Sequence, residues 1–216
     1  MRKINLLLLV LGIMALMRRA LSAVLLIALS VAIEQAAAQS DQSWEKVRDT
    51  SPNKKFGMRI KCESEPEDPE HIDSVLITAI DLVSLPSKKV AAQLLPSDDV
   101  GTNFEDVTLT WSADSKWCAF YYNQPRIGYT TVFRRVGDKF VAANKPQKLM
   151  IHLKGDVRDE YIRPVKWVQP GELVLKQTTI FRADAEANYE FTARFDSKTE
   201  KFQVTSKREI PADEDR

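Results

Sequence analysis

The feature that most constrains the fold of this chain is an alternation of apolar and other residues with a period of two. Residues 56–62 read F-G-M-R-I-K-C and residues 189–195 read Y-E-F-T-A-R-F, so every second side chain is apolar. This is the period of a β-strand with one buried face, and segments with the period of a helix are scarce. The sequence therefore predicts an all-β domain.

Two further segments, 75–82 and 117–122, are apolar on both faces, which is typical of strands in the middle of a layered structure. In the second, strand geometry places Trp117 and Tyr121 on one face and Cys118 and Tyr122 on the other. Further expected strands lie at 129–135, 139–142, 149–153 and 172–181, with a helical turn within 87–95. Turns are expected at 136–138, 170–171 and 196–199, and acidic, polar loops at 63–71 and 96–106.

A polar turn followed by an apolar strand recurs along the chain. Residues 111–120 read W-S-A-D-S-K-W-C-A-F, residues 51–58 read S-P-N-K-K-F-G-M, and residues 166–175 read K-W-V-Q-P-G-E-L-V-L. Such a recurrence, at separations of 56 to 61 residues, is typical of sheets that stack one on the next. The alternative is that these are ordinary β-turns, which favour the same residues. The residues expected to form the repeated turns are Ser51, Asn53, Trp111, Ser112, Asp114, Trp167 and Gly171.

The segment 111–120 resembles the repeat signature of TolB-like β-propellers, whose usual form is W-S-P-D-G-x-x-[apolar]-A-[apolar]. Alanine and serine stand where that signature has proline and glycine. The segment at Ser51 is a weaker match without the tryptophan, and the segment at Trp167 lacks the serine and the aspartate. The matching positions are Trp111, Ser112, Asp114, Ala119 and Phe120. The resemblance implies a propeller-like fold.

Length limits this architecture, because a propeller blade uses roughly 40 to 45 residues and closed propellers usually have about four to eight blades. We therefore expect stacked antiparallel sheets that form either a small ring or an incomplete, propeller-like stack. A β-sandwich is the alternative. An unclosed stack would leave edges that need cover by loops or a partner.

The N-terminal residues 1–38 are expected to be a leader outside the fold, which leaves 39–216 as a single domain. Two apolar stretches of 14 residues, 4–17 and 20–33, flank Arg18-Arg19. The second stretch, with a functional start at Met17 and small residues at 36–38, has the organisation of a secretory signal. An uncleaved membrane anchor and a twin-arginine export signal are the alternatives. The protein is thus expected to be exported, to the periplasm or outside the cell.

The charge balance argues against one class of partner, and the two cysteines raise the question of a disulfide. The whole chain has 31 basic and 30 acidic residues. Four of the basic residues and one of the acidic residues lie in the leader, so residues 39–216 carry 27 basic and 29 acidic residues and are nearly neutral. Because nucleic-acid-binding surfaces need a strong basic excess, no nucleic-acid partner is expected. Cys62 and Cys118 could form a disulfide in an oxidising compartment, although their places in the expected strands do not favour the bond, and two free thiols are the alternative.

The sequence contains no recognised catalytic pattern. His71 falls in an acidic loop and His152 in an expected strand, and no nucleophile elbow, zinc-binding helix or phosphate-binding loop occurs. The acidic loop offers Glu65, Glu67 and Asp68 as weak calcium candidates, although a solvated charge run is the simpler interpretation. No cofactor is expected.

Aromatic residues are the remaining binding candidates. Trp117, Tyr121 and Tyr122 crowd one segment, where they could form a binding platform or simply the core of the central sheet. The leading functional hypothesis is an exported, non-enzymatic module that binds a protein partner. The alternatives are a module that binds carbohydrate or a surface polymer, and a hydrolase with an unrecognised site. Contact with a membrane is expected only through an uncleaved leader.

Overall fold

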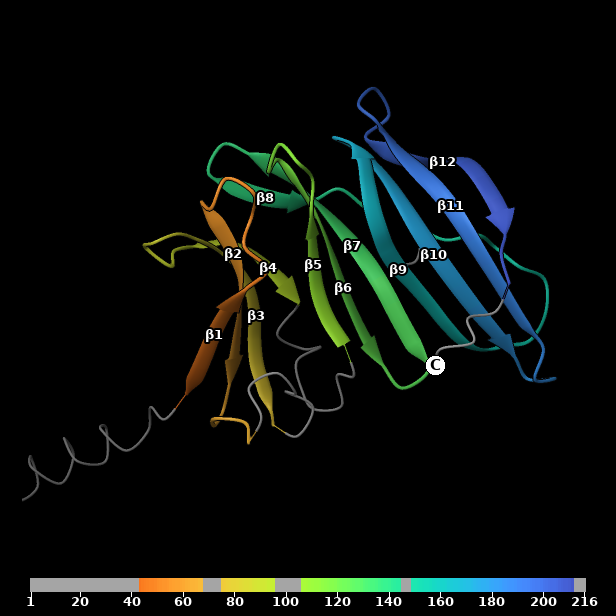
Figure 1. Ribbon diagram of the computed structural model, residues 1–216, viewed down its shortest axis with the longest axis horizontal. Coiled ribbons are helices and arrows are strands. Elements are labelled where there is room, and N and C mark those ends of the chain that lie inside the picture. The colour runs from red at the N-terminus through yellow and green to blue at the C-terminus, as the bar shows by residue number, and fades with distance from the viewer. Residues whose placement is uncertain (1–42, 68–74, 96–105, 145–148, 212–216) are drawn as a thin grey trace, which may run out of the picture. The chain divides into compact units, whose positions relative to one another are not determined.

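The computed structural model describes residues 43–67, 75–95, 106–144 and 149–211, which belong to one unit, Ser43–Arg216. Within these ranges the regular elements are all strands (Figure 1), and no helix there could cross a membrane. The strands are β1 (Trp44–Arg48), β2 (Phe56–Cys62), β3 (Ile77–Ser84), β4 (Val90–Leu95), β5 (Asp106–Trp111), β6 (Trp117–Gln124), β7 (Ile127–Val136), β8 (Lys139–Ala142), β9 (Val157–Gln169), β10 (Glu172–Phe181), β11 (Glu186–Asp196) and β12 (Lys201–Glu209). The all-β prediction is confirmed.

The strands form three successive blocks of four, each an antiparallel meander in which every strand pairs with the next. The blocks are β1–β4, β5–β8 and β9–β12. A short parallel pairing of Ile127 with Glu160 and of Gly128 with Tyr161 joins the second and third blocks. The result is a four-stranded sheet and an eight-stranded sheet, neither of which closes into a barrel. The predicted stacking of sheets is therefore confirmed, with one parallel pairing that periodicity could not reveal.

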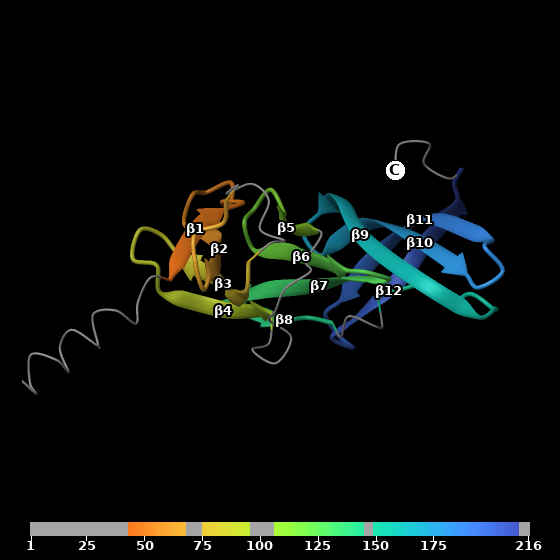
Figure 2. The ribbon, with the colours of Figure 1, turned by 90° about the horizontal axis from the view of Figure 1, so that it is seen from below.

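Two hydrophobic cores lie on either side of the central strand β6. Cys118 and Phe120 belong to the core shared with the first block, which includes Met58 and Ile60. Ala119, on the other face of β6, belongs to the core shared with the third block. The prediction that 117–122 is apolar on both faces is confirmed, and Figure 2 shows β6 and β7 between the outer blocks.

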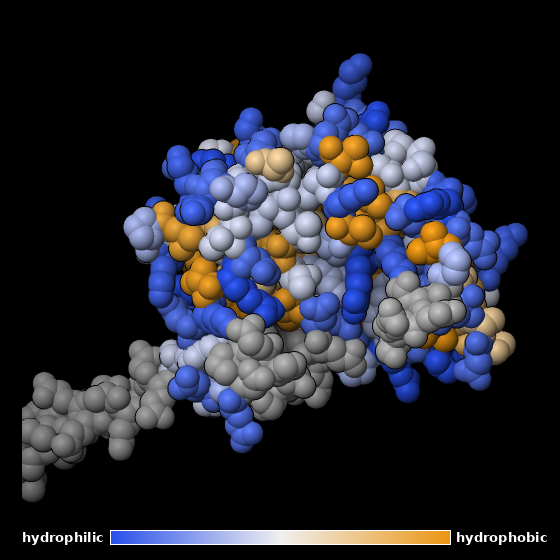
Figure 3. Space-filling view, viewed as in Figure 1, coloured by the Kyte–Doolittle hydropathy of each residue, from blue (hydrophilic) through white to orange (hydrophobic). Residues whose placement is uncertain are grey.

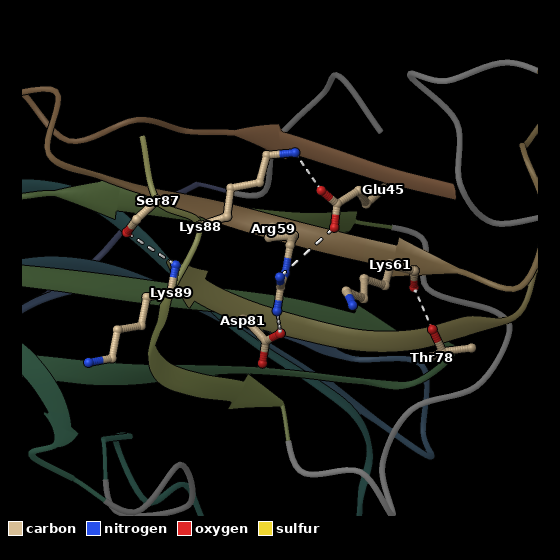
Figure 4. A network of polar contacts seen from close by, with 8 residues as sticks. All are labelled: Glu45, Arg59, Lys61, Thr78, Asp81, Ser87, Lys88 and Lys89. Carbon is tan, nitrogen blue, oxygen red and sulfur yellow. Dashed lines mark hydrogen bonds and ion pairs between the residues drawn. The ribbon is translucent and has the colours of Figure 1, made fainter. Parts of the chain in front are cut away.

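The outer face of the first block has a polar network at its centre. Arg59 and Asp81 alternate with buried core residues along β2 and β3, so they point away from the core, and their side chains form an ion pair. Glu45 of β1 pairs with Arg59 and also with Lys88, which lies on the turn between β3 and β4 (Figure 4). A polar outer face ends a stack of repeats, because it removes the need for another sheet to cover it.

The outer face of the third block is also polar. Thr178 donates a hydrogen bond of 2.7 Å to Asn188, and Arg194 forms a two-pronged contact with Glu172 on the neighbouring strand. With polar groups on both outer faces, the open stack does not require a further sheet to cover it.

Two expected elements are wrong. Residues 87–95 contain no helical turn, because Val90–Leu95 is a strand that continues the meander and buries Ala91 and Leu95. Residues 149–153 are not a strand: Leu149 and Ile151 are buried, but their backbone follows an irregular path. Most of the expected loop 96–106 lies outside the described residues.

Candidate functional site

The first turns of blocks one and two share one set of hydrogen bonds. Ser51 Oγ lies 2.8 Å from Asn53 Oδ1 and accepts the Phe56 N–H at 3.0 Å. Sixty-one residues later, Ser112 Oγ lies 2.7 Å from Asp114 Oδ1 and accepts the Trp117 N–H at 3.0 Å. In both turns, the aspartate or asparagine oxygen also accepts the N–H two residues further on, at 3.0 Å. The two segments therefore form the same local structure.

The residue after the asparagine or aspartate has a left-handed backbone in both turns. Lys54 and Ser115 each have a φ of +58°, the conformation for which the resembling signature uses glycine. Ser115 is fully buried, and its Oγ accepts the Asn53 N–H at 3.1 Å. The serine that replaces glycine thus links the second turn to the first.

A tryptophan of each later block bonds back to the block before it. The Trp111 indole N–H donates to the Asp49 carbonyl at 2.7 Å, and the Trp167 indole N–H donates to the Thr110 carbonyl at 3.0 Å. Asp49 and Thr110 are both two residues before the turn serine of their block. The tryptophans therefore fix successive blocks at equivalent points, which explains their recurrence.

The third block has the equivalent tryptophan, Trp167, but the turn between its first two strands is shorter. Gln169 and Glu172 pair directly, and Gly171 at φ +77° makes the tight connection. In every block the residue before the second strand accepts a backbone N–H from the end of the third strand. The bonds are Leu85 N–H to Lys55 O, Arg135 N–H to Lys116 O, and Phe195 N–H to Gly171 O. Both hairpin turns of each block therefore lie together.

We call the surface formed by these six turns the turn end. It consists of residues 52–55, 86–90, 113–116, 136–139, 168–170 and 197–201, all exposed except Ser115. In Figure 1 it lies along the upper side of the three blocks, and in Figure 3 the same rim shows hydrophilic and hydrophobic atoms side by side. It is the surface to which all three blocks contribute equivalent residues.

The two turn serines give a direct test of equivalence. Ser51 and Ser112 are 1% and 0% exposed, so alanine at either position leaves a strand-initiating N–H without its acceptor. We expect Ser51→Ala and Ser112→Ala each to lower the free energy of unfolding by about 1–3 kcal/mol. Urea denaturation followed by tryptophan fluorescence measures this loss. Ser87→Ala, at an exposed turn, is the control and should stay within about 0.5 kcal/mol; a near-zero loss at either buried serine would contradict the assignment.

Arg48 and Asp49 cap the open edge of β5 with side chains in place of a strand. Arg48 Nη2 donates to the Val107 carbonyl, and Asp49 Oδ2 accepts the Leu109 N–H at 3.0 Å. Strand edges with unpaired backbone groups invite pairing with other chains. This pair therefore blocks strand addition at β5 and ties the first block to the second.

Burial raises the pKa of the Asp49 carboxyl above its ordinary value of 3.8, although the Leu109 N–H opposes the shift. A raised pKa means that the folded state favours the protonated form, so this contribution to stability is present below pH 3.8 and lost as the pH rises through the folded pKa. Asparagine accepts the same hydrogen bond without a charge, and it tolerates the φ of +49° well.

We therefore expect Asp49→Asn to raise the free energy of unfolding at pH 7, with the gain shrinking toward zero as the pH falls below 4. Asp49→Ala should lower it by about 1–2 kcal/mol at every pH, because the Leu109 N–H loses its acceptor. Denaturation curves between pH 3 and pH 8 measure both. A gain for Asp49→Asn that grows on acidification would show that the sign of the pKa shift is wrong.

The aromatic candidates lie inside the structure. Of the two interpretations of this segment, the core of the central sheet is the one that Tyr121 fits, because it is 1% exposed and its hydroxyl accepts a hydrogen bond of 3.1 Å from Arg163 Nε. Trp117 is partly buried among the rings of the third block, and Tyr122 stacks on Phe120. These residues hold blocks together.

The disulfide does not form, since Cys62 and Cys118 are both free and buried. They belong to the same core, yet Cys62 ends β2 whereas Cys118 lies one residue after the start of β6. Because the turns before these strands lie together, the thiols are five positions apart along the strand direction, or roughly 16 Å. A disulfide needs Cβ atoms about 4 Å apart. Burial also raises the pKa of both thiols.

The metal candidates that the structure describes are exposed. Glu65 and Glu67 point to solvent, while Asp68 and His71 lie outside the described residues. Among the residues that the structure describes, no three histidine, cysteine or acidic side chains are grouped as metal ligands would be. The other histidine, His152, is exposed near Glu160, whose pKa is raised by burial.

Lysines at equivalent turn positions are the feature that sequence reasoning missed. Lys55 and Lys116 both precede the second strand of their block, and Lys89 and Lys139 both lie where the fourth strand begins. All four side chains are exposed, and within the described ranges none of them forms an ion pair. Aligning S-P-N-K-K with S-A-D-S-K would have shown the first pair.

No family model matches the chain, and no curated protein is significantly similar to it.

Proposed function

We propose that this chain is an exported, non-enzymatic binding module, resembling a reduced TolB-like propeller, that docks a partner on its turn end. The observation that carries the proposal is the convergence of six exposed turns from three equivalent blocks on one surface. Repetition of this kind presents the same residue types side by side, which suits a broad partner surface better than a small molecule. Export is part of the proposal and rests on the leader.

The arrangement of lysines supports docking. Lys55, Lys89, Lys116 and Lys139 are exposed at repeated positions, whereas the aromatic rings beneath them pack between blocks. A carbohydrate-binding site would need exposed rings, and the burial of Tyr121 argues against that alternative. A docking role requires only an exposed surface on which the same type of residue recurs.

Site-specific photocrosslinking in cells that make the protein tests this proposal. A diazirine amino acid at position 55 or 116 samples the turn end, and the same probe at Lys154 or Asp184, both exposed on other turns, is the matched control. We expect adducts, with protein or lipid, at the first two positions and few at the controls. Equal yields at all four positions would contradict a docking role for the turn end.

A further inference from the structure

The turn end carries more positive than negative charge: its residues include eight lysines, one of which pairs with Glu45, against Asp114, Asp138 and Glu200. Lys55 and Lys116 occupy one equivalent position in the first two blocks, and Lys89 and Lys139 occupy another. Facing sheets pack about 10 Å apart, so the four ammonium groups form an array of about that spacing between blocks. Lys54, in the first turn, and Lys198 and Lys201, in the last turn of the third block, extend the array.

The arginines of this region are already engaged. Arg134 contacts Glu200 at 3.3 Å and lies over the Phe195 ring, while Arg135 lies over the Phe56 ring and bonds to the Gly137 carbonyl. Arginine is the residue that recognises individual carboxylates or phosphates in fixed geometry, whereas lysine acts as a mobile point charge. The free charges here are therefore suited to a field of anions rather than to one oriented group.

Aliphatic side chains stand among the lysines, one from each block. Val90, Val136 and Val168 are 46%, 52% and 58% exposed, and each lies at the end of a strand where it meets the turn end. A protein interface of ordinary strength is centred on aromatic and arginine side chains, which this surface lacks in exposed form. Lysines mixed with aliphatic tips are typical of surfaces that lie against a lipid interface.

At the opposite end of the blocks, the described turns carry charges of both signs. Asp156 and Asp184 pair there with Arg182 and Arg158. The other exposed charges of these described turns are Glu63, Glu65, Glu67, Arg126 and Lys154. An anionic surface would therefore attract the turn end more strongly than the opposite end, and electrostatic orientation of this kind speeds association.

We propose that the turn end docks onto an anionic lipid surface, with the lysine array at the headgroups and the three valines at the interface. This inference rests on the proposed docking function and names its partner. It differs from the expectation that only a retained leader contacts a membrane. Binding by this route depends on lipid charge and falls with salt, because each contact is screened beyond a Debye length of about 10 Å at 0.1 M ionic strength.

The test is sedimentation of residues 39–216 with vesicles of phosphatidylcholine containing 40% phosphatidylglycerol, with pure phosphatidylcholine vesicles as the reference. We expect binding to the anionic vesicles only, and its loss in 0.5 M salt. Each lysine near an anionic surface contributes roughly a fivefold factor in affinity, so Lys55→Glu with Lys116→Glu should weaken binding at least about 25-fold. Val136→Ser with Val168→Ser should weaken it several-fold.

The matched control is Lys154→Glu with Lys207→Glu, which makes the same change in net charge at exposed positions away from the turn end. We expect this control to bind within about threefold of the parent, the change that screened long-range charge allows. Equal losses in the two double variants, or equal binding to neutral vesicles, would overturn the lipid inference. Turn-end crosslinks to a protein without any vesicle binding would overturn it while leaving the docking function standing, whereas loss of both results would remove both proposals.

Discussion

Replacing Gln177 with leucine is expected to lower the free energy of unfolding by about 3–5 kcal/mol, because two buried backbone groups lose their partners at once. Gln177 is fully buried on β10, and its side-chain amide bonds to both backbone groups of Ile151 in the irregular segment 149–153. Its Oε1 accepts the Ile151 N–H at 2.7 Å, and its Nε2 donates to the Ile151 carbonyl at 2.9 Å. The glutamine thus replaces the strand pairing that this segment lacks.

Urea denaturation followed by circular dichroism measures the loss, and hydrogen exchange at the Ile151 amide reports its local cause. We expect exchange at Ile151 to accelerate strongly, since its N–H bonds only to Gln177 among the described contacts. Gln203→Leu, on the exposed strand β12, is the matched control and should change stability by about 0.5 kcal/mol or less. Gln177→Leu with no more effect than the control would show that the segment is held by packing alone.

Gly128→Ala is expected to destabilise the protein by about 3 kcal/mol, at the upper end of the usual cost of overpacking. A Cβ at this position on β7 would lie 2.4 Å from the Tyr121 hydroxyl oxygen and 2.9 Å from Asn123 Cβ. Tyr121 has little room to move, because it is 1% exposed and its hydroxyl is bonded to Arg163. Gly128 also pairs with β9, so a displaced backbone would disturb the junction of the second and third blocks.

The identity of the closest atom allows a rescue experiment. Tyr121→Phe removes that oxygen, so we expect the Tyr121→Phe, Gly128→Ala double variant to recover about 1 kcal/mol relative to the sum of the single changes. Gly137→Ala is the matched control: a Cβ there meets nothing within 4 Å, and only its φ of +62° imposes a cost, of about 1 kcal/mol. Thermal and urea denaturation measure all four variants. Strict additivity of the two changes would contradict the proposed clash.

Much of the local structure was predictable, because it depends on residues close in sequence. The alternation in 56–62 determines β2, and the glycines of 136–138 and 170–171 mark turns that occur where expected. The two serine turns form through hydrogen bonds that span five residues or fewer, so the same letters produce the same bonds twice.

The candidate surface was only partly predictable. The recurrence of Trp111 and Trp167 indicated stacked units, but their acceptors in the preceding block lie 62 and 57 residues away. The sequence left open whether the rings of 117–122 form a platform or the core, because a ring-rich strand has the same sequence whether it is central or exposed. The lysine array was missed because it exists only once the turns of separate blocks lie together.

The sequence by itself determined that this chain forms strands, where most of them turn, and which residues repeat, since periodicity and turn chemistry act over a few residues. Only the tertiary structure decided the parallel pairing of β7 with β9, the separation of Cys62 from Cys118, and the capture of Ile151 by Gln177. These depend on how loops bring distant strands together, where the burial of apolar faces and the pairing of polar groups are decided jointly, and no short pattern carries that information.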